Sequence, residues 1–280
     1  MRPIFRFLLP LVVAVAIASP ARAQEDVLYP FPDRESPYRL GIELGANYSL
    51  FSRSIAFTPF DNPTSPNHVI GSGSGLGGFV DIAASRDLGE RLRVYARAGV
   101  EFVRIVSSGD AVVDLPSSGN FFDTTAVSFK RSSSTYFFTG ELGLQYDFFE
   151  RDRGLYGSLG LVDHRWGGST TTTNRFELPA AGGRTFPNGT TVNETTADDT
   201  TSFEQNRLGL HIGLGWQLPI TDNLILAPEL SFHYMFGAPF PDQTTAVDDF
   251  RHNTLGDLEV STDNAALHYL RFGLGLWWRL

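Results

Sequence analysis

Large apolar residues alternate with small or polar residues along the last stretch of the chain, Ala265–Leu280. The apolar set is Leu270, Phe272, Leu274, Leu276, Trp278 and Leu280, and the set between them includes Gly273, Gly275, Arg271 and Arg279. A period of two residues predicts a β-strand whose two faces meet different surroundings. Such a strand fits a soluble sandwich, and it equally fits a membrane barrel with lipid on one side and a polar lumen on the other.

The same alternation recurs in earlier segments and predicts eight strands in all. The earlier ones are Tyr38–Leu50, Leu76–Ser85, Leu92–Val103, Phe138–Phe148, Leu155–Val162, Arg207–Leu218 and Leu224–Phe236. The fourth could begin as early as Ser128, and the fifth has the weakest pattern.

The connections between these strands alternate between long and short. The long ones, rich in Ser, Thr, Asn, Gly and Pro, are Phe51–Gly73, Ser107–Val127, Trp166–Thr201 and Gly237–Asn264. The short ones are Arg86–Arg91, Glu150–Gly154 and Pro219–Asn223. An antiparallel meander would gather the long loops at one end and the short turns at the other. Within the longest loop, Phe186-Pro187-Asn188-Gly189 could turn a hairpin that extends beyond the barrel.

The aromatic residues of the apolar faces fall at two heights along the strands. Tyr146, Phe148, Trp216 and Trp278 lie near the short turns, and Tyr48, Phe102, Tyr234 and Phe236 lie near the long loops. Aromatic girdles that bracket an aliphatic band are typical of membrane barrels, whereas a soluble sandwich has no reason to sort its rings. The sequence therefore predicts an all-β, eight-stranded antiparallel up-and-down transmembrane β-barrel, closed so that no backbone group is left unpaired in lipid.

The N-terminal residues indicate export. Residues 1–23 carry early arginines, an apolar stretch and Ala21-Arg22-Ala23, which predicts a cleaved signal peptide. Residues 24–37 form a polar lead-in, and residues 38–280 form the barrel. The predicted location is the outer membrane of a Gram-negative cell envelope with both termini in the periplasm. The chain has no cysteine, and its net charge of −9 argues against nucleic acid as a partner.

The signal peptide, the alternating strands and the final LRFGLGLWWRL resemble the OmpA/OmpX-type family of small outer-membrane barrels, including the PorT-like barrels. The resemblance covers nearly the whole mature chain and is architectural. It implies that the last strand is recognised by the barrel-assembly machinery, although the chain ends in Leu280 with Trp278 two positions earlier, where the family usually ends in an aromatic residue. It also implies contact with outer-membrane lipid and lipopolysaccharide. There is no room for the peptidoglycan-binding domain that follows the barrel in OmpA.

Charged residues fall on the face predicted to point inward. Glu43, Asp81, Arg97, Glu101, Glu141, Glu229 and Arg271 are expected to form a lumen ion-pair network, with Arg93, His211 and His233 on the same face. Because small barrels are filled by side chains and buried charges need partners, we expect a plug of ion pairs. The alternative is a narrow water or proton path, which the many inward glycines favour.

The sequence contains no motif that defines a catalytic, metal-binding or phosphate-binding site. A lipid-modifying enzyme would need His, Ser and an acid at one height, and the best pair, His233 with Ser231, is predicted to face inward, whereas lipid A deacylases of this architecture use lipid-facing residues. No two histidines have a convincing metal spacing, Gly71–Gly78 lacks the lysine of a phosphate loop, and the loop acids at Asp248, Asp249 and Asp257 read as solvated charges. We therefore expect no catalytic site, no cofactor and no metal.

The long loops are where an extracellular ligand would meet the protein, because loops on a rigid scaffold often carry function. Exposed aromatics such as Phe121, Phe122 and Phe240 would suit surface recognition. The sequence thus predicts an integral outer-membrane protein with a structural or surface-interaction role, with a small-solute or water channel and a lipid-modifying enzyme as alternatives.

Overall fold

The computed structural model describes residues 36–59, 68–70, 72–116, 122–149, 151–179, 183, 185–186, 189–199, 206–237, 239, 245–249 and 254–280. The predicted signal peptide and most of the lead-in lie outside these residues, as do the side chains of Phe121, Phe122 and Phe240. Within the described residues, no helix has the length and apolar character needed to cross a membrane.

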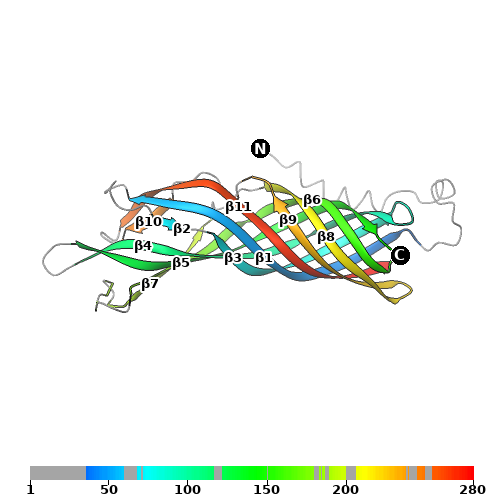
Figure 1. Ribbon diagram of the computed structural model, residues 1–280, viewed down its shortest axis with the longest axis horizontal. Coiled ribbons are helices and arrows are strands. Elements are labelled where there is room, and N and C mark those ends of the chain that lie inside the picture. Colours follow the sequence, from blue (N-terminus) through cyan, green and yellow to red (C-terminus); the bar gives the residue numbers. More distant parts are fainter. Residues whose placement is uncertain are drawn as a thin grey trace.

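Eight antiparallel strands form a closed ring (Figure 1). They are β1 (Tyr38–Pro59), β3 (Gly73–Asp87), β4 (Leu92–Pro116), β5 (Phe122–Asp147), β6 (Gly154–Glu177), β8 (Asn206–Thr221), β9 (Leu224–Met235) and β11 (Thr254–Arg279). Each pairs with the next, and β11 closes the ring against β1 from Arg39↔Arg279 onward. The predicted fold is confirmed, and the C-terminal strand is the closing seam.

The predicted strand ends are wrong on the side of the long connections. β4 and β5 pair without interruption from Leu92↔Tyr146 to Pro116↔Phe122, through the segment predicted as the loop Ser107–Val127. Three short strands extend the sheet in the same region: β2 (His68–Ile70) on β1, β7 (Val192–Asp199) on β6, and β10 (Thr245–Asp249) on β11.

The physical reason is that a strand outside lipid needs no apolar face. Thr and Val favour strands through their branched side chains, and cross-strand hydroxyl pairs replace apolar contacts. Thr173 on β6 and Thr196 on β7 illustrate this, with their hydroxyls 3.1 Å apart. Polar composition was therefore a poor guide to where pairing stops.

The turn predicted within the longest connection joins β6 to β7. The amide of Gly189 donates to the carbonyl of Phe186 at 2.8 Å, and the amide of Phe186 donates to the carbonyl of Thr190 at 2.8 Å. Gly189 has a φ of 77°, which suits glycine because it has no Cβ. The hairpin stands outside the ring, with β7 pairing only β6 among the described strands.

The two faces of each strand are as the alternation predicted. On β3, Ile82 is 61% exposed and its neighbour Asp81 is 1% exposed, and the same alternation runs through β8 and β9. The apolar residues therefore form the outer surface of the ring, and the charged residues fill its lumen. This inverts the arrangement of a soluble domain.

The short turns and the C-terminus lie at one end of the ring, and the β4–β5 hairpin extends from the other (Figure 1). At the turn end, the amide of Leu280 donates to the carbonyl of Tyr38, and the amide of Arg279 donates to the carbonyl of Asn223. We call this end the turn end and the opposite one the hairpin end.

Candidate functional site

Arg97 lies at the centre of the lumen and gathers three of the predicted network residues. Its guanidinium donates to both carboxylate oxygens of Glu229 on β9, at 2.9 and 2.8 Å. It also lies 3.2 Å from Glu43 on β1 and 3.5 Å from Glu141 on β5. Because β4 carries Arg97, one side chain connects four strands through the interior.

Arg271 on β11 gathers the other two. Its Nη2 lies 2.5 Å from Asp81 on β3, and its Nε lies 4.0 Å from Glu101 on β4. Its guanidinium also stacks over the Phe79 ring at 3.5 Å. All seven residues of the predicted network thus lie in one layer, and each is at most 7% exposed.

Three histidines lie in the same layer, although nothing in their spacing along the chain indicated it. His211 on β8 lies between His233 on β9 and Ser158 on β6, with its Nδ1 3.0 Å from His233 Nε2 and its Nε2 2.8 Å from Ser158 Oγ. The described polar contacts of His233 are with His211, Arg271 and Glu141 rather than with Ser231, which the sequence analysis singled out. The barrel curvature, which a strand-by-strand reading does not supply, brings these rings together.

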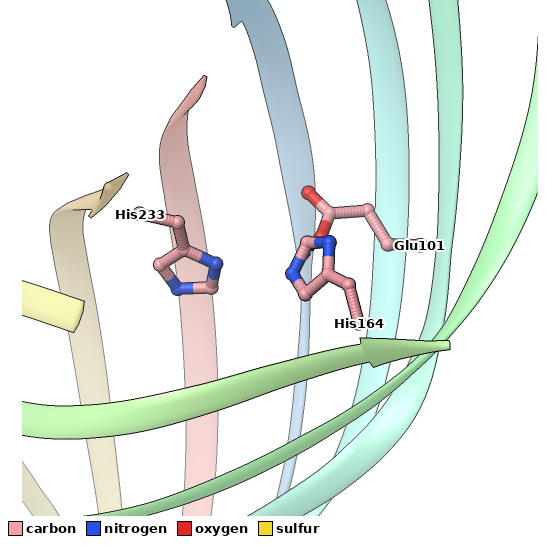
Figure 2. A group of neighbouring side chains, drawn as sticks. All are labelled: Glu101, His164 and His233. Carbon is pink, nitrogen blue, oxygen red and sulfur yellow. Dashed lines mark ion pairs between the residues drawn. The ribbon is translucent and has the colours of Figure 1, made fainter. Parts of the chain in front are cut away.

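His164 on β6 is the third histidine and was not assigned to the lumen from the sequence. It is fully buried, and its Nε2 lies 3.4 Å from Glu101 Oε2. Figure 2 shows the Glu101 carboxylate beside the His164 ring, with the His233 ring facing them from β9. Neither ring nitrogen of His164 has a hydrogen-bond partner among the described residues.

Apolar layers close this charged layer on both sides. Towards the turn end lies a cluster of Ala83, Tyr156, Ile225, Ala227 and Trp277. Towards the hairpin end lies a larger one of Phe51, Val103, Ile105, Phe137, Val162, Trp166, Met235, Leu267 and Tyr269. The charges therefore sit in a compartment sealed from water, which makes their pairing a condition of folding.

A second ion-pair cluster, which the sequence reasoning did not identify, closes the turn end. Arg39 pairs with Asp87 at 3.0 Å and with Asp152 at 2.6 Å, while Arg93 lies 2.9 Å from both Asp147 and Asp152. Arg279 also pairs with Asp152, and Arg151 pairs with Asp87. Inward arginines at the turn end of their strands, together with acidic residues in or beside the short turns, were the signal that could have revealed this cluster.

Asp152 is the hub of this turn-end cluster. It has a φ of 62°, a left-handed conformation that Asp tolerates better than most residues. Burial acts to raise the pKa of its carboxyl, but the guanidiniums of Arg39, Arg93 and Arg279 outweigh burial and hold that pKa below its usual range. The carboxylate therefore stays ionised in the folded protein.

The predicted girdle residues lie on the outer surface. All eight rings are between 39% and 56% exposed: Tyr48, Phe102, Tyr146, Phe148, Trp216, Tyr234, Phe236 and Trp278. Tyr146 pairs edge-on with Phe148, and Tyr234 with Phe236, at 5.6 and 5.7 Å between ring centroids. Leucine, isoleucine and valine side chains occupy the surface between the two sets.

Comparisons with known proteins return outer-membrane barrels of low similarity. Neisserial surface protein A (NspA) is 14% identical, with 89% of this chain and 100% of that chain covered and a TM-score of 0.31. OprG from Pseudomonas aeruginosa is 13% identical, with 88% and 98% covered and a TM-score of 0.34. Ail of Yersinia pestis is 10% identical, with 88% and 100% covered and a TM-score of 0.27. No family model and no curated protein matches the chain. The barrel assignment therefore rests on the strand pairing and the exposed apolar belt described above.

Proposed function

We propose that this protein is an integral outer-membrane barrel with a closed lumen, which holds paired β-hairpins above the membrane for surface interactions. The observation that carries the proposal is the continuation of the ring strands beyond the aromatic rings as fully paired ladders. β4 and β5 pair as far as Pro116↔Phe122, and β6 continues to Glu177 with β7 beside it. Loops that merely connect strands would not need this backbone pairing.

The exposed belt supports membrane residence. Leu44, Ile82 and Phe272 are 56%, 61% and 58% exposed, which would be costly on a surface that faces water. Closure of β11 on β1 leaves no unpaired edge in the ring, as a lipid environment requires. In the proposed orientation the turn end and both termini face the periplasm, and the hairpin end faces outward, as in the OmpA/OmpX-type barrels.

The layered lumen supports a closed barrel rather than a channel. Between the two ends, ions or solutes would have to cross two apolar layers and a layer of paired charges. We infer that the monomer conducts no steady current, and that its role is carried by the hairpins. The predicted contact of the last strand with the barrel-assembly machinery belongs to this proposal as well.

Two measurements test the proposal. The refolded barrel is reconstituted in planar bilayers, where steady large openings of the monomer would contradict a closed lumen. Intact cells that display the protein are treated with a protease, and the cleavage sites are mapped. Cleavage in the hairpins and not in the short turns is expected, and cleavage in the turn around Asp152 would overturn the orientation.

A matched variant tests the role of the hairpins. Residues 171–198 are replaced by an Asn-Gly turn, which removes the β6–β7 hairpin outside the ring. The variant should insert into the membrane as the wild type does, but it should lose self-association of displaying cells, measured by sedimentation of a cell suspension. Unchanged sedimentation would contradict a surface role for this hairpin.

A further inference from the structure

We propose that Glu101, His164 and His233 form a buried site for one divalent transition-metal ion of the Zn²⁺ class. The three residues come from β4, β6 and β9 and point toward one another inside the lumen (Figure 2). One ligand atom from each lies within 4.8 Å of the other two, and all three side chains are fully buried. Two imidazoles and a carboxylate are a donor set that suits Zn²⁺.

The atoms that would bind the ion are those that the protein leaves without hydrogen bonds. They are Nε2 of His164, which lies 3.4 Å from Glu101 Oε2, together with Nδ1 of His233 and Oε2 of Glu101, none of which has a hydrogen-bond partner among the described residues. Buried polar atoms are nearly always satisfied, and an unsatisfied one costs about 1–3 kcal/mol. Several such atoms facing one small space point to a missing ligand rather than to chance.

Neighbouring hydrogen bonds hold two of the three ligands, Glu101 and His233, in place. Asn47 donates to Oε1 of Glu101 at 2.9 Å, which leaves Oε2 for the ion. On the far side of the His233 ring, Nε2 lies 3.0 Å from His211 Nδ1. With an ion on Nδ1, Nε2 of His233 carries the proton and donates it to His211, whose own Nε2 lies beside Ser158 and Glu229. Metal-bound histidines commonly have such a supporting partner.

The charge balance of the layer also favours a dication. Five carboxylates (Glu43, Asp81, Glu101, Glu141 and Glu229) share the buried lumen with three guanidiniums (Arg97, Arg207 and Arg271) among the described residues. If all five carboxylates are ionised and the histidines are neutral, the layer holds two more negative than positive charges. One divalent ion neutralises this excess without protonating any ligand.

Two arginines lie near the site, and their positive charges would oppose a metal ion unless other groups accept their hydrogen bonds. Arg271 is 3.3 Å from His233 Nε2 but is paired with Asp81 at 2.5 Å. Arg207, opposite His164 on β8, donates to the carbonyls of Gly237 and Leu267. Each guanidinium thus has an acceptor outside the three proposed ligands, and Nε of Arg271 lies 4.0 Å from Oε1 of Glu101, the oxygen that is not assigned to the ion.

A second grouping of Glu141, His211 and His233 also has the right residue types. Most of its atoms are already used, because His211 bonds His233 and Ser158 through its two ring nitrogens, and the Tyr95 hydroxyl donates to Oε1 of Glu141 at 2.6 Å. Only Oε2 of Glu141, 3.7 Å from His233 Nε2, is without a hydrogen-bond partner among the described residues. The two groupings share His233. We therefore assign the ion to the grouping in which every residue offers an unsatisfied atom, and His211 to its support.

Apolar side chains cover the site, and this predicts the stage of folding at which the ion binds. Phe137 and Tyr269 cover His164, with ring centroids 5.7 and 5.0 Å away, and they belong to the apolar layer on the hairpin side. Three protein ligands leave one position of a tetrahedral ion open, as in catalytic zinc sites. Because apolar side chains cover this site and would keep substrate from that position, we assign the ion a structural role. The ion must therefore be bound during folding and be released slowly afterwards.

The test uses the full mature barrel, refolded in detergent with and without Zn²⁺ and then passed through a chelating column. Elemental analysis should find one zinc per folded chain when zinc is present during refolding, and essentially none when it is added afterwards. Refolding with Co²⁺ should give the visible absorption of a low-coordinate cobalt site. Absence of stoichiometric metal or of this absorption would overturn the proposal.

Variants locate the ion. Glu101→Gln and His164→Gln should lose the retained zinc, while His268→Gln, on the outer side of β11, should retain it as the wild type does. His211→Gln should weaken binding by about 10- to 100-fold, as loss of a supporting partner does, but keep the cobalt absorption at saturating metal. Loss of the ion in His211→Gln with retention in His164→Gln would place it in the other grouping and refute the assignment. Folding of each variant is checked by its heat-dependent mobility on a gel.

Discussion

Arg97 and Glu229 form a two-pronged ion pair across the lumen, with both guanidinium nitrogens within 2.9 Å of carboxylate oxygens. They are far apart in the chain and lie on strands that are not neighbours in the ring, β4 and β9. The pair therefore ties opposite walls of the barrel together in a way that backbone pairing cannot.

Arg97→Met is expected to destabilise the barrel by about 3–5 kcal/mol, because it leaves buried carboxylates uncompensated. Urea unfolding in lipid vesicles, followed by tryptophan fluorescence, measures the loss. Arg104→Gln, at an exposed position of the same strand, is the matched control and should change little. The double variant Arg97→Met with Glu229→Met should recover part of the loss, and a double variant worse than the sum of the two single ones would contradict the pairing.

Asp152→Asn should lower stability at neutral pH, since the side chain loses its charge beside Arg39 and Arg93 but keeps the left-handed backbone that Asn tolerates. The folded pKa is depressed, so the carboxylate stabilises the fold above the unfolded pKa of about 3.9 and loses this contribution as the pH falls through the folded pKa. The stability difference between wild type and variant should therefore shrink below about pH 4. A difference that does not depend on pH would contradict the electrostatic role.

Leu44→Arg should cost about 2–4 kcal/mol in lipid, because this exposed position lies midway along the membrane-facing part of β1. Leu40→Arg, on the same face beside the turn end, should cost at most about 1 kcal/mol. Both variants are compared by equilibrium folding into vesicles of one lipid. Equal costs at the two positions would contradict the placement of the belt.

Removal of residues 270–280 should abolish membrane insertion, because β11 pairs with both β9 and β1 over this stretch. Removal of the β6–β7 hairpin should leave insertion intact. The two truncations are compared by membrane fractionation and heat-dependent gel mobility. An inserted barrel without residues 270–280 would show that closure does not depend on this strand.

Faces and connectivity could be predicted from the sequence because both follow from local rules. The alternation of large and small residues assigns Leu274 to the outer face and Gly273 to the inner face without knowledge of any partner strand. The alternation of long and short connections predicts that consecutive strands are antiparallel neighbours. Strand ends could not be predicted in this way. The stretch from Ser107 to Pro116 pairs with β5 although its composition is that of a loop, because pairing depends on a partner strand rather than on burial.

The composition of the lumen layer could be predicted, but its contacts could not. The two-residue alternation along each strand predicts that Arg97, Glu141 and Glu229 point inward. Which of these side chains contact one another depends on the barrel curvature and on the stagger between strands. His164 on β6 and His233 on β9 have β8 between them, and they come together because the sheet curves inward across these three strands. Spacing rules for metal ligands are built for helices and short loops, so they gave no signal here.

The β4–β5 ladder has a mechanical consequence. From Phe102↔Tyr136 to Pro116↔Phe122 it is paired at every step, and at about 3.4 Å per residue this amounts to roughly 50 Å of ribbon. The ribbon does not stand alone over this length, because β5 stays paired with β6 as far as Ser128↔Glu177 and β4 pairs with β3 as far as Gly73↔Ser107. Only the steps from Ala111↔Val127 to Pro116↔Phe122 extend past both neighbours. A partner that pulls on the hairpin tip would therefore load the β5–β6 ladder together with the β4–β5 ladder, and the force would be shared by several strands of the ring.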